Sequence, residues 1–180
     1  MNKKIMIAGI AVVVLIALVV LTNVSDNLNQ NKGEAQDIKK LINDYTLGNV
    51  QAQNASVTSE ELIVTGSDSN EEVYEMPEDE FFVSIAPYVE QTHPCSNHSL
   101  TGCQGEMAKE DFEVYIEDEE GNAVVDETIT SQANGFIDLW LPRDKTYSIK
   151  ISNEGKSVES DLSTFEGDNT CITTMQLTDA

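Results

Sequence analysis

Two histidines and two cysteines lie within the twelve-residue stretch THPCSNHSLTGC, residues 92–103. The whole sequence has only three cysteines and two histidines, and the third cysteine, Cys171, lies near its far end. Thiolate sulfur is a soft ligand that selects Cu(I), zinc or iron–sulfur clusters. Three thiolates meeting at one point suit trigonal Cu(I), and adding one imidazole would suit tetrahedral zinc.

Spacing alone leaves three interpretations of the cysteines open. Cys95 and Cys103 can form one structural disulfide, or Cys171 can tie the loop to a distant strand. The three thiols can instead bind a metal, or they can carry out thiol–disulfide exchange, although the usual C-x-x-C arrangement is absent. His93 and His98 are interpreted either as loop residues that hydrogen-bond the backbone or as groups that assist a metal, including as ligands of Cu(II).

The first 24 residues predict export from the cytoplasm. Lys3 and Lys4 precede an uncharged apolar run over 5–21, long enough for a helix of roughly 25 Å. The lysines favour a cytoplasmic N-terminus, and the run is longer than that of an ordinary signal peptide. We expect 1–24 to be a membrane anchor or a signal peptide, with a linker at 25–33 and an extracytoplasmic remainder. Cysteines there usually pair, so an odd number is informative.

The charge of the chain excludes one class of partner. The sequence has 10 basic and 32 acidic residues, a formal net charge of −22. Binding to nucleic acid depends on lysine and arginine contacts to phosphate, so we expect no nucleic-acid partner. No calcium-loop, P-loop, G-x-S-x-G or H-E-x-x-H pattern is present, and we expect no dedicated enzyme.

Periodicity predicts an α+β fold in two parts. Residues 34–108 are predicted to form a small helix-plus-hairpin unit that carries the Cys/His loop, with helices at 35–47 and 78–92 and two strands within 60–77. Residues 109–180 are predicted to form an antiparallel β-sandwich that carries Cys171. Its alternating segments are 112–118, 122–130, 135–142, 146–152, 157–165 and 171–177. A site with all three cysteines would then lie where the two parts meet.

Three segments of this sequence resemble the CueP family of extracytoplasmic copper-binding proteins. They are APYVEQTHPCSNHSLTGCQGEM at 86–107, NGFIDLWLPRDKTY at 134–147 and STFEGDNTCITTMQL at 163–177. The similarity extends over about residues 36–178. In that family the copper ligands are three cysteines, and the matching positions here are Cys95, Cys103 and Cys171.

The resemblance implies a copper chaperone or copper-resistance protein of the cell envelope. The implied cargo is Cu(I), with reduction of Cu(II) by the same thiols. The implied recipient is a Cu,Zn superoxide dismutase or another cuproenzyme, and disulfide oxidoreductases or a second copy of the chain are further candidate partners. The long apolar run at 5–21 differs from a cleavable signal and indicates a membrane-tethered, periplasmic or cell-surface protein. The competing hypotheses are a thiol–disulfide redox protein and a structural module with one disulfide and no metal.

Overall fold

The computed structural model describes residues 37–179 of the chain. The predicted membrane segment and linker, 1–24 and 25–33, lie outside these residues. Within 37–179, no helix combines the length and the apolar character needed to cross a bilayer. By its contacts the chain divides into two units, Met1–Lys39 and Lys40–Ala180, and every strand belongs to the second unit.

A short helix at 37–46 confirms the first predicted helix. Ile42 and Tyr45 are buried, one helical turn apart, as the spacing of the apolar residues requires. Gly48 ends the helix with a φ of 71°, in the left-handed region that glycine enters without steric cost.

The first sheet is antiparallel and contains four strands in the order β3-β2-β1-β5. Its strands are β1 (Asn54–Val57), β2 (Glu61–Thr65), β3 (Glu71–Glu75) and β5 (His98–Ser99). Strands β2 and β3 confirm the predicted pair of strands around a Gly/Ser/Asp/Asn turn. The two-residue strand β5 pairs with β1 so that His98 lies opposite Val57, and this pairing fixes one residue of the Cys/His loop on a sheet edge.

The second sheet has five antiparallel strands in the order β12-β10-β9-β6-β7. Its strands are β6 (Asp111–Asp118), β7 (Ala123–Thr130), β9 (Thr146–Asn153), β10 (Lys156–Ser163) and β12 (Thr178–Asp179). Phe112, Val114 and Ile116 of β6 are buried while the residues between them are exposed, which is the alternation of a sheet with one covered face. Four of the predicted sandwich strands are therefore present in this sheet. The antiparallel strand predicted at 171–177 is wrong, because only Cys171–Ile172 form a strand there and it pairs in parallel with the strand Glu80–Ile85.

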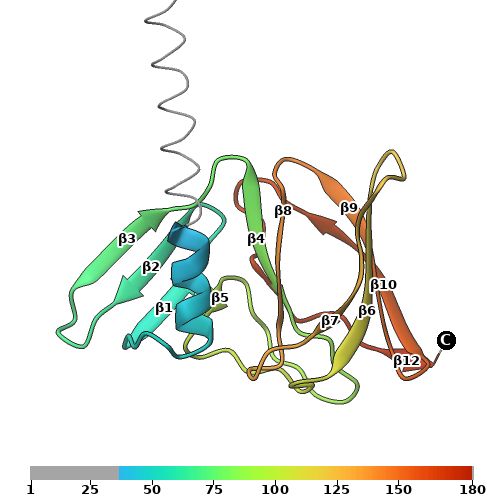
Figure 1. The fold of residues 1–180 in the computed structure, drawn as a ribbon, viewed down its shortest axis with the longest axis horizontal. Coiled ribbons are helices and arrows are strands. Elements are labelled where there is room, and N and C mark those ends of the chain that lie inside the picture. Colours follow the sequence, from blue (N-terminus) through green and yellow to red (C-terminus); the bar gives the residue numbers. More distant parts are fainter. Residues whose placement is uncertain (1–36, 180) are drawn as a thin grey trace, which may run out of the picture. The chain divides into compact units, whose positions relative to one another are not determined.

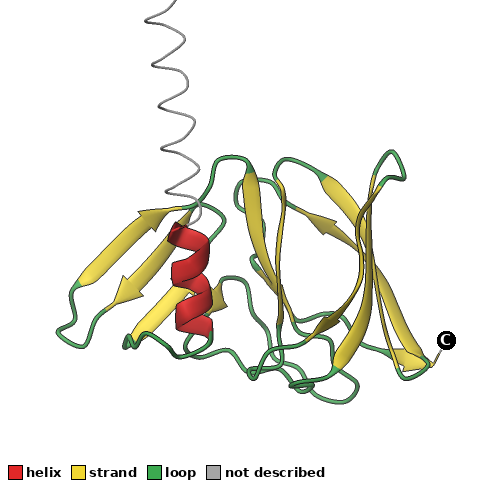
Figure 2. Cartoon of the chain, in the orientation of Figure 1, coloured by secondary structure: helices red, strands yellow, loops and turns green. Residues whose placement is uncertain are grey.

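The third sheet covers that face and has three strands in the order β11-β4-β8. Its strands are β4 (Glu80–Ile85), β8 (Ile137–Pro142) and β11 (Cys171–Ile172). Phe81, Val83 and Ile85 of β4 enter the same core cluster as the buried residues of β6, so these two sheets pack face to face (Figures 1 and 2). Within residues 37–179, the arrangement is a β-sandwich with one short helix and an additional small sheet.

Strand β4 corrects the second predicted helix, at 78–92. Residues 80–85 form the central strand of the third sheet, paired with β8 on one side and with β11 on the other. All residues from Phe81 to Ile85 are buried, because both faces of this sheet are covered. A continuous apolar run is typical of a strand covered on both faces, and the acidic residues before it do not mark a helix start.

Candidate metal centre

The structure brings all three cysteines together. Cys95 and Cys171 form a disulfide across 76 residues of sequence, with a Cα–Cα distance of 5.6 Å. The free thiol of Cys103 lies with its Sγ 3.5 Å from Sγ of Cys95. Cys95 is therefore the middle sulfur of the cluster, in contact with both others.

Short backbone contacts place each sulfur. Cys171 opens β11 and lies opposite Ser84 of β4 in a parallel pair, while its amide donates to the carbonyl of Ser96 at 3.0 Å. The amide of Cys103 donates to the carbonyl of Ser99 at 3.0 Å, which closes a turn directly after β5. The loop therefore lies against the start of β11, and the pairing of β5 with β1 holds its middle. Cys171 is buried whereas Cys95 and Cys103 are half-buried, so the cluster is open to solvent only on the loop side.

Both histidines lie beside the sulfurs. One imidazole nitrogen of His93 lies within 4.8 Å of the sulfurs of Cys95 and Cys103, and one nitrogen of His98 lies within 4.8 Å of those of Cys103 and Cys171. His93 is half-buried in the loop, whereas His98 has no exposed surface. The five residues singled out from the sequence therefore form one cluster.

His98 is held as a neutral imidazole. Burial, and to a smaller extent the nearby charge of His93, lower its pKa to about 4. Its backbone amide donates to Oγ1 of Thr170 at 3.0 Å, and its ring centroid lies 4.6 Å from that of Phe136. Neutral imidazole is the form that binds metal ions.

The two ring nitrogens of His98 have different surroundings. Nε2 lies 3.3 Å from Oγ of Ser84, within hydrogen-bond distance. Nδ1 is buried and has no hydrogen-bond partner among the described residues. A buried polar atom without a partner is costly, and a bound cation would satisfy it.

Three polar residues behind His98 were not identified from the sequence. They are Ser84, Asp138 and Thr170; Asp138 and Thr170 lie within the segments that resemble the CueP family, but no role could be assigned to them there. Ser84 and Asp138 are register partners on β4 and β8, and they lie on the face opposite the sandwich core. Oγ of Ser84 donates to Oδ1 of Asp138 at 2.5 Å, and Nε2 of Gln132 donates to Oδ2 at 2.9 Å. Burial raises the pKa of Asp138, and these hydrogen bonds oppose that rise.

Two contacts fix the loop on either side of the cysteines. The carboxylate of Glu106 accepts hydrogen bonds from the amides of Val89, Glu90 and Gln91, at 2.8, 2.9 and 3.1 Å. Gly105 lies directly against the backbone of Gly135, because a Cβ atom built on Gly105 would come within 2.6 Å of the Gly135 carbonyl oxygen. These contacts anchor the segment after Cys103 to the segment before Cys95 and to the turn before β8.

The cluster has two chemical states. When Cys95 and Cys171 are bonded, only the Cys103 thiol remains. When all three are reduced, three sulfurs and up to two imidazoles surround one point, and this donor set suits a soft, small cation. The three sulfurs and one imidazole nitrogen of His98 therefore fit a copper ion.

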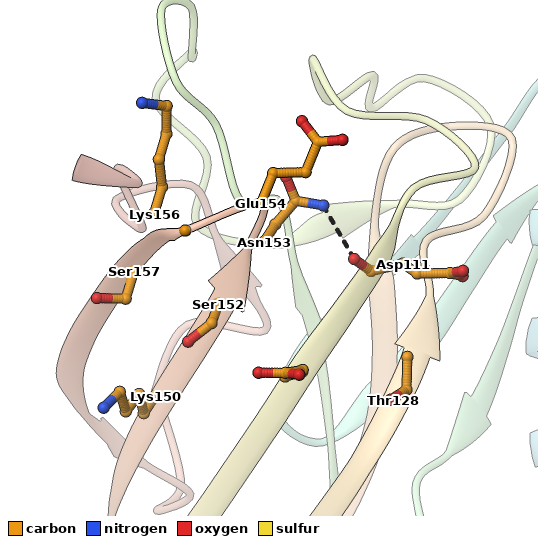
Figure 3. A pocket seen from close by; sticks show the side chains of 10 residues that line it. Asp111, Thr128, Lys150, Ser152, Asn153, Glu154, Lys156 and Ser157 are labelled. Carbon is orange, nitrogen blue, oxygen red and sulfur yellow. Dashed lines mark hydrogen bonds between the residues drawn. The ribbon is translucent and has the colours of Figure 1, made fainter. Parts of the chain in front are cut away.

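A surface hollow elsewhere lacks such donors. Its volume is about 390 Å³, and Figure 3 shows its lining on the outer side of β6 and β9. Nδ2 of Asn153 donates to the carbonyl of Asp111 there at 2.9 Å. The lining is mixed in charge and contains neither cysteine nor histidine, so the hollow does not belong to the thiol cluster.

Comparisons with known proteins identify a family for this chain. Residues 37–176 match the family model described as "Periplasmic copper-binding protein CueP". A solved structure described as "Crystal Structure of S.CueP" is similar to this chain with a TM-score of 0.73 and 33% sequence identity, over 78% of this chain and 88% of that one. Among curated proteins no match was found. The match to the family model over most of the sequence and the shared fold show that this chain belongs to the CueP family.

Proposed function

We propose that this chain binds one Cu(I) ion outside the cytoplasm, through the thiolates of Cys95, Cys103 and Cys171. The family to which it belongs is one of periplasmic copper-binding proteins, and this supports an extracytoplasmic copper-binding role. The observation that carries the proposal is the convergence of all three sulfurs, with Cys103 3.5 Å from Cys95 and Cys171 bonded to Cys95. Three thiolates supply the soft trigonal donor set that Cu(I) prefers.

The histidines have supporting roles in this proposal. His98 is neutral and buried beside Cys103 and Cys171, so it supplies a nitrogen donor on the closed side of the site. His93 lies on the open side beside Cys95 and Cys103, where an incoming Cu(II) ion would meet imidazole before thiol. Imidazole suits the oxidised ion and thiolate suits the reduced one.

Reduction of copper follows from the same residues. Two Cu(II) ions each accept one electron, Cys95 and Cys171 together lose two electrons and two protons, and the S–S bond forms between them. The products are two Cu(I) ions, one disulfide and two protons, so the step balances without a further cofactor. A reductant of thiol–disulfide type must then restore the thiols before the chain can hold Cu(I) through all three cysteines.

The biological role that we infer is copper sequestration and transfer to an extracytoplasmic cuproenzyme. A site made of half-buried sulfurs beside a surface loop allows another protein to approach the ion. A copper-dependent superoxide dismutase is the candidate recipient implied by the family resemblance.

The test is a Cu(I) titration of the reduced full-length protein against a chromophoric chelator, with thiols counted before and after loading. One tightly bound copper ion that protects all three thiols from alkylation is the expected result. Failure to compete with the chelator would overturn the proposal.

A second candidate function is thiol–disulfide exchange with a partner protein. The 3.5 Å contact between the Cys103 thiol and the disulfide sulfur of Cys95 favours it, because attack by one thiolate could release Cys171. This function predicts rapid mixed-disulfide formation with a partner and no dependence on copper. Trapping such a complex from the metal-free protein would distinguish it from copper binding.

A further inference from the structure

A chain of hydrogen bonds lies behind the thiol cluster. It runs from His98 through Ser84 to Asp138, with a distance of 3.3 Å from Nε2 to Oγ and 2.5 Å from Oγ to Oδ1. Ser84 has no exposed surface and is the register partner of both Cys171 on β11 and Asp138 on β8. Cys171, Ser84 and Asp138 therefore lie side by side across the third sheet, on the face that carries the thiol cluster.

The donors around Asp138 set the direction of each hydrogen bond. Gln132 donates its amide N–H to Oδ2 of Asp138, so that oxygen acts as an acceptor. The single hydroxyl proton of Ser84 points to Oδ1. With its proton used in this way, Oγ of Ser84 can only accept from the histidine. Nε2 of His98 then carries the ring proton, and the lone pair of the ring is on Nδ1.

We propose that Ser84 and Asp138 are positioning residues that hold His98 in the Nε2–H tautomer and leave Nδ1 as the donor for copper. Nδ1 is the nitrogen that is buried without a partner. The ring cannot turn freely, because Phe136 contacts it at 4.6 Å between centroids and Phe82 lies 6.2 Å away. A carboxylate that orients a metal-binding imidazole through its other nitrogen is a general device of metal sites.

The benefit of this tautomer for copper binding rests on the proposed function, but the tautomer itself can be measured without copper. The first experiment is nitrogen NMR of the imidazole rings in the reduced, metal-free full-length protein. The sequence has only two histidines, so a His93→Gln variant assigns the signals. The expected result is a proton on Nε2 of His98 and none on Nδ1. A proton on Nδ1 would overturn the inference with no further variant.

The second experiment reverses the direction of the hydrogen bonds. In Asp138→Asn the new amide can donate to Oγ of Ser84, whose hydroxyl then donates to Nε2, so the ring proton should move to Nδ1. Ser84→Ala removes the connection and should leave a mixture of tautomers; it also provides a test if the asparagine variant does not fold. Asp118→Asn is the matched control, because Asp118 is a hydrogen-bonded carboxylate in the β6–β7 turn.

Copper binding provides the last readout. We expect Asp138→Asn to weaken Cu(I) binding about 10- to 100-fold in chelator competition, the range found when outer partners of metal ligands are replaced. Asp118→Asn should bind like the parent protein. If the parent binds copper tightly and Asp138→Asn binds equally tightly, the positioning role is wrong while the copper site stands. If the parent binds no copper, the proposed function fails, and the NMR result still decides the tautomer.

Discussion

The three sulfurs are not equivalent, because each has a different environment. The sulfur of Cys95 contacts the other two sulfurs. Cys103 is half-buried, whereas Cys171, at the start of β11, is only 1% exposed. In the proposed site, an ion that enters from the loop side would meet the half-buried residues His93, Cys95 and Cys103 before the buried Cys171.

We predict that Cys171→Ser weakens Cu(I) binding at least about 100-fold, because a hydroxyl is a poor ligand for a soft cation. Chelator competition on the reduced protein measures the loss. Thr173→Ser, a conservative change two residues away at another buried position, should bind like the parent. If Cys171→Ser binds Cu(I) as tightly as the parent, Cys171 is excluded as a copper ligand.

The two histidines are expected to differ in their effect on Cu(I). His98→Asn removes the donor that Asp138 orients, so it should weaken Cu(I) binding at least as much as Asp138→Asn does, about 10- to 100-fold, and His93→Asn should weaken it less. The reason is that His98 is wholly buried beside Cys171, whereas His93 is half-buried in the loop. Parallel competition titrations check the order, and a larger loss in His93→Asn would contradict it.

At the scale of elements, the carboxylate of Glu106 anchors the segment after the Cys/His loop to the segment before it. The amide of Glu90 makes the hydrogen bond that lowers the pKa of Glu106 most, burial opposes it, and the amides of Gln91 and Val89 add to the lowering. The folded pKa is therefore below the unfolded value, so this contribution to stability is present above the unfolded value of 4.5 and is lost as the pH falls through the folded pKa.

We expect Glu106→Gln to unfold at lower urea concentration than the parent at pH 7. The difference should shrink as the pH falls below 4.5 and disappear once the pH is below the folded pKa of Glu106, where the parent carboxylate is protonated as well. Urea unfolding at a series of pH values measures the difference. Glu110→Gln, whose side chain is exposed, is a control for the change of charge. If the two proteins still unfold at different urea concentrations in acid, the charge of Glu106 is not the cause of the difference in stability.

The elements also show what sequence could and could not predict. Alternation identified β6, β7, β9 and β10 because one face of their sheet is covered and the other is exposed. Strand β4 lacks alternation because both of its faces are covered, and the acidic residues before it suit the first turn of a helix, so the sequence predicts a helix there. All three cysteines and both histidines could be identified because these residue types are rare in the sequence. Ser84 and Asp138 could not, since only the register of β4 against β8 places them behind His98.

At the scale of the whole molecule, one disulfide joins distant parts of the chain. Cys95 and Cys171 are separated by 76 residues, so their bond restricts a large loop of the unfolded chain. The variant Cys103→Ser keeps the Cys95–Cys171 disulfide and excludes any other pairing of the cysteines. We predict that its free energy of unfolding is about 4 kcal/mol higher in the oxidised form than in the reduced form.

Urea unfolding with and without a reductant measures this difference. The double variant Cys95→Ser/Cys103→Ser retains only Cys171 and should show no effect of the reductant. Equal stability of oxidised and reduced Cys103→Ser would show that the disulfide does not constrain the unfolded chain. Copper held by three thiolates would join the same segments, so Cu(I) should raise the stability of the reduced parent.

The contact between Gly105 and Gly135 has a consequence for how this protein can change over generations. Each glycine occupies the space that a Cβ atom on the other would need, at 2.6 Å in one direction and 2.7 Å in the other. Gly135 also has a φ of 80°, which makes any side chain there unfavourable. No single substitution at either position is compensated by a change at the other, because both partners are backbone atoms. Each glycine is therefore expected to be retained on its own account, as long as the segment after Cys103 stays packed against the turn before β8.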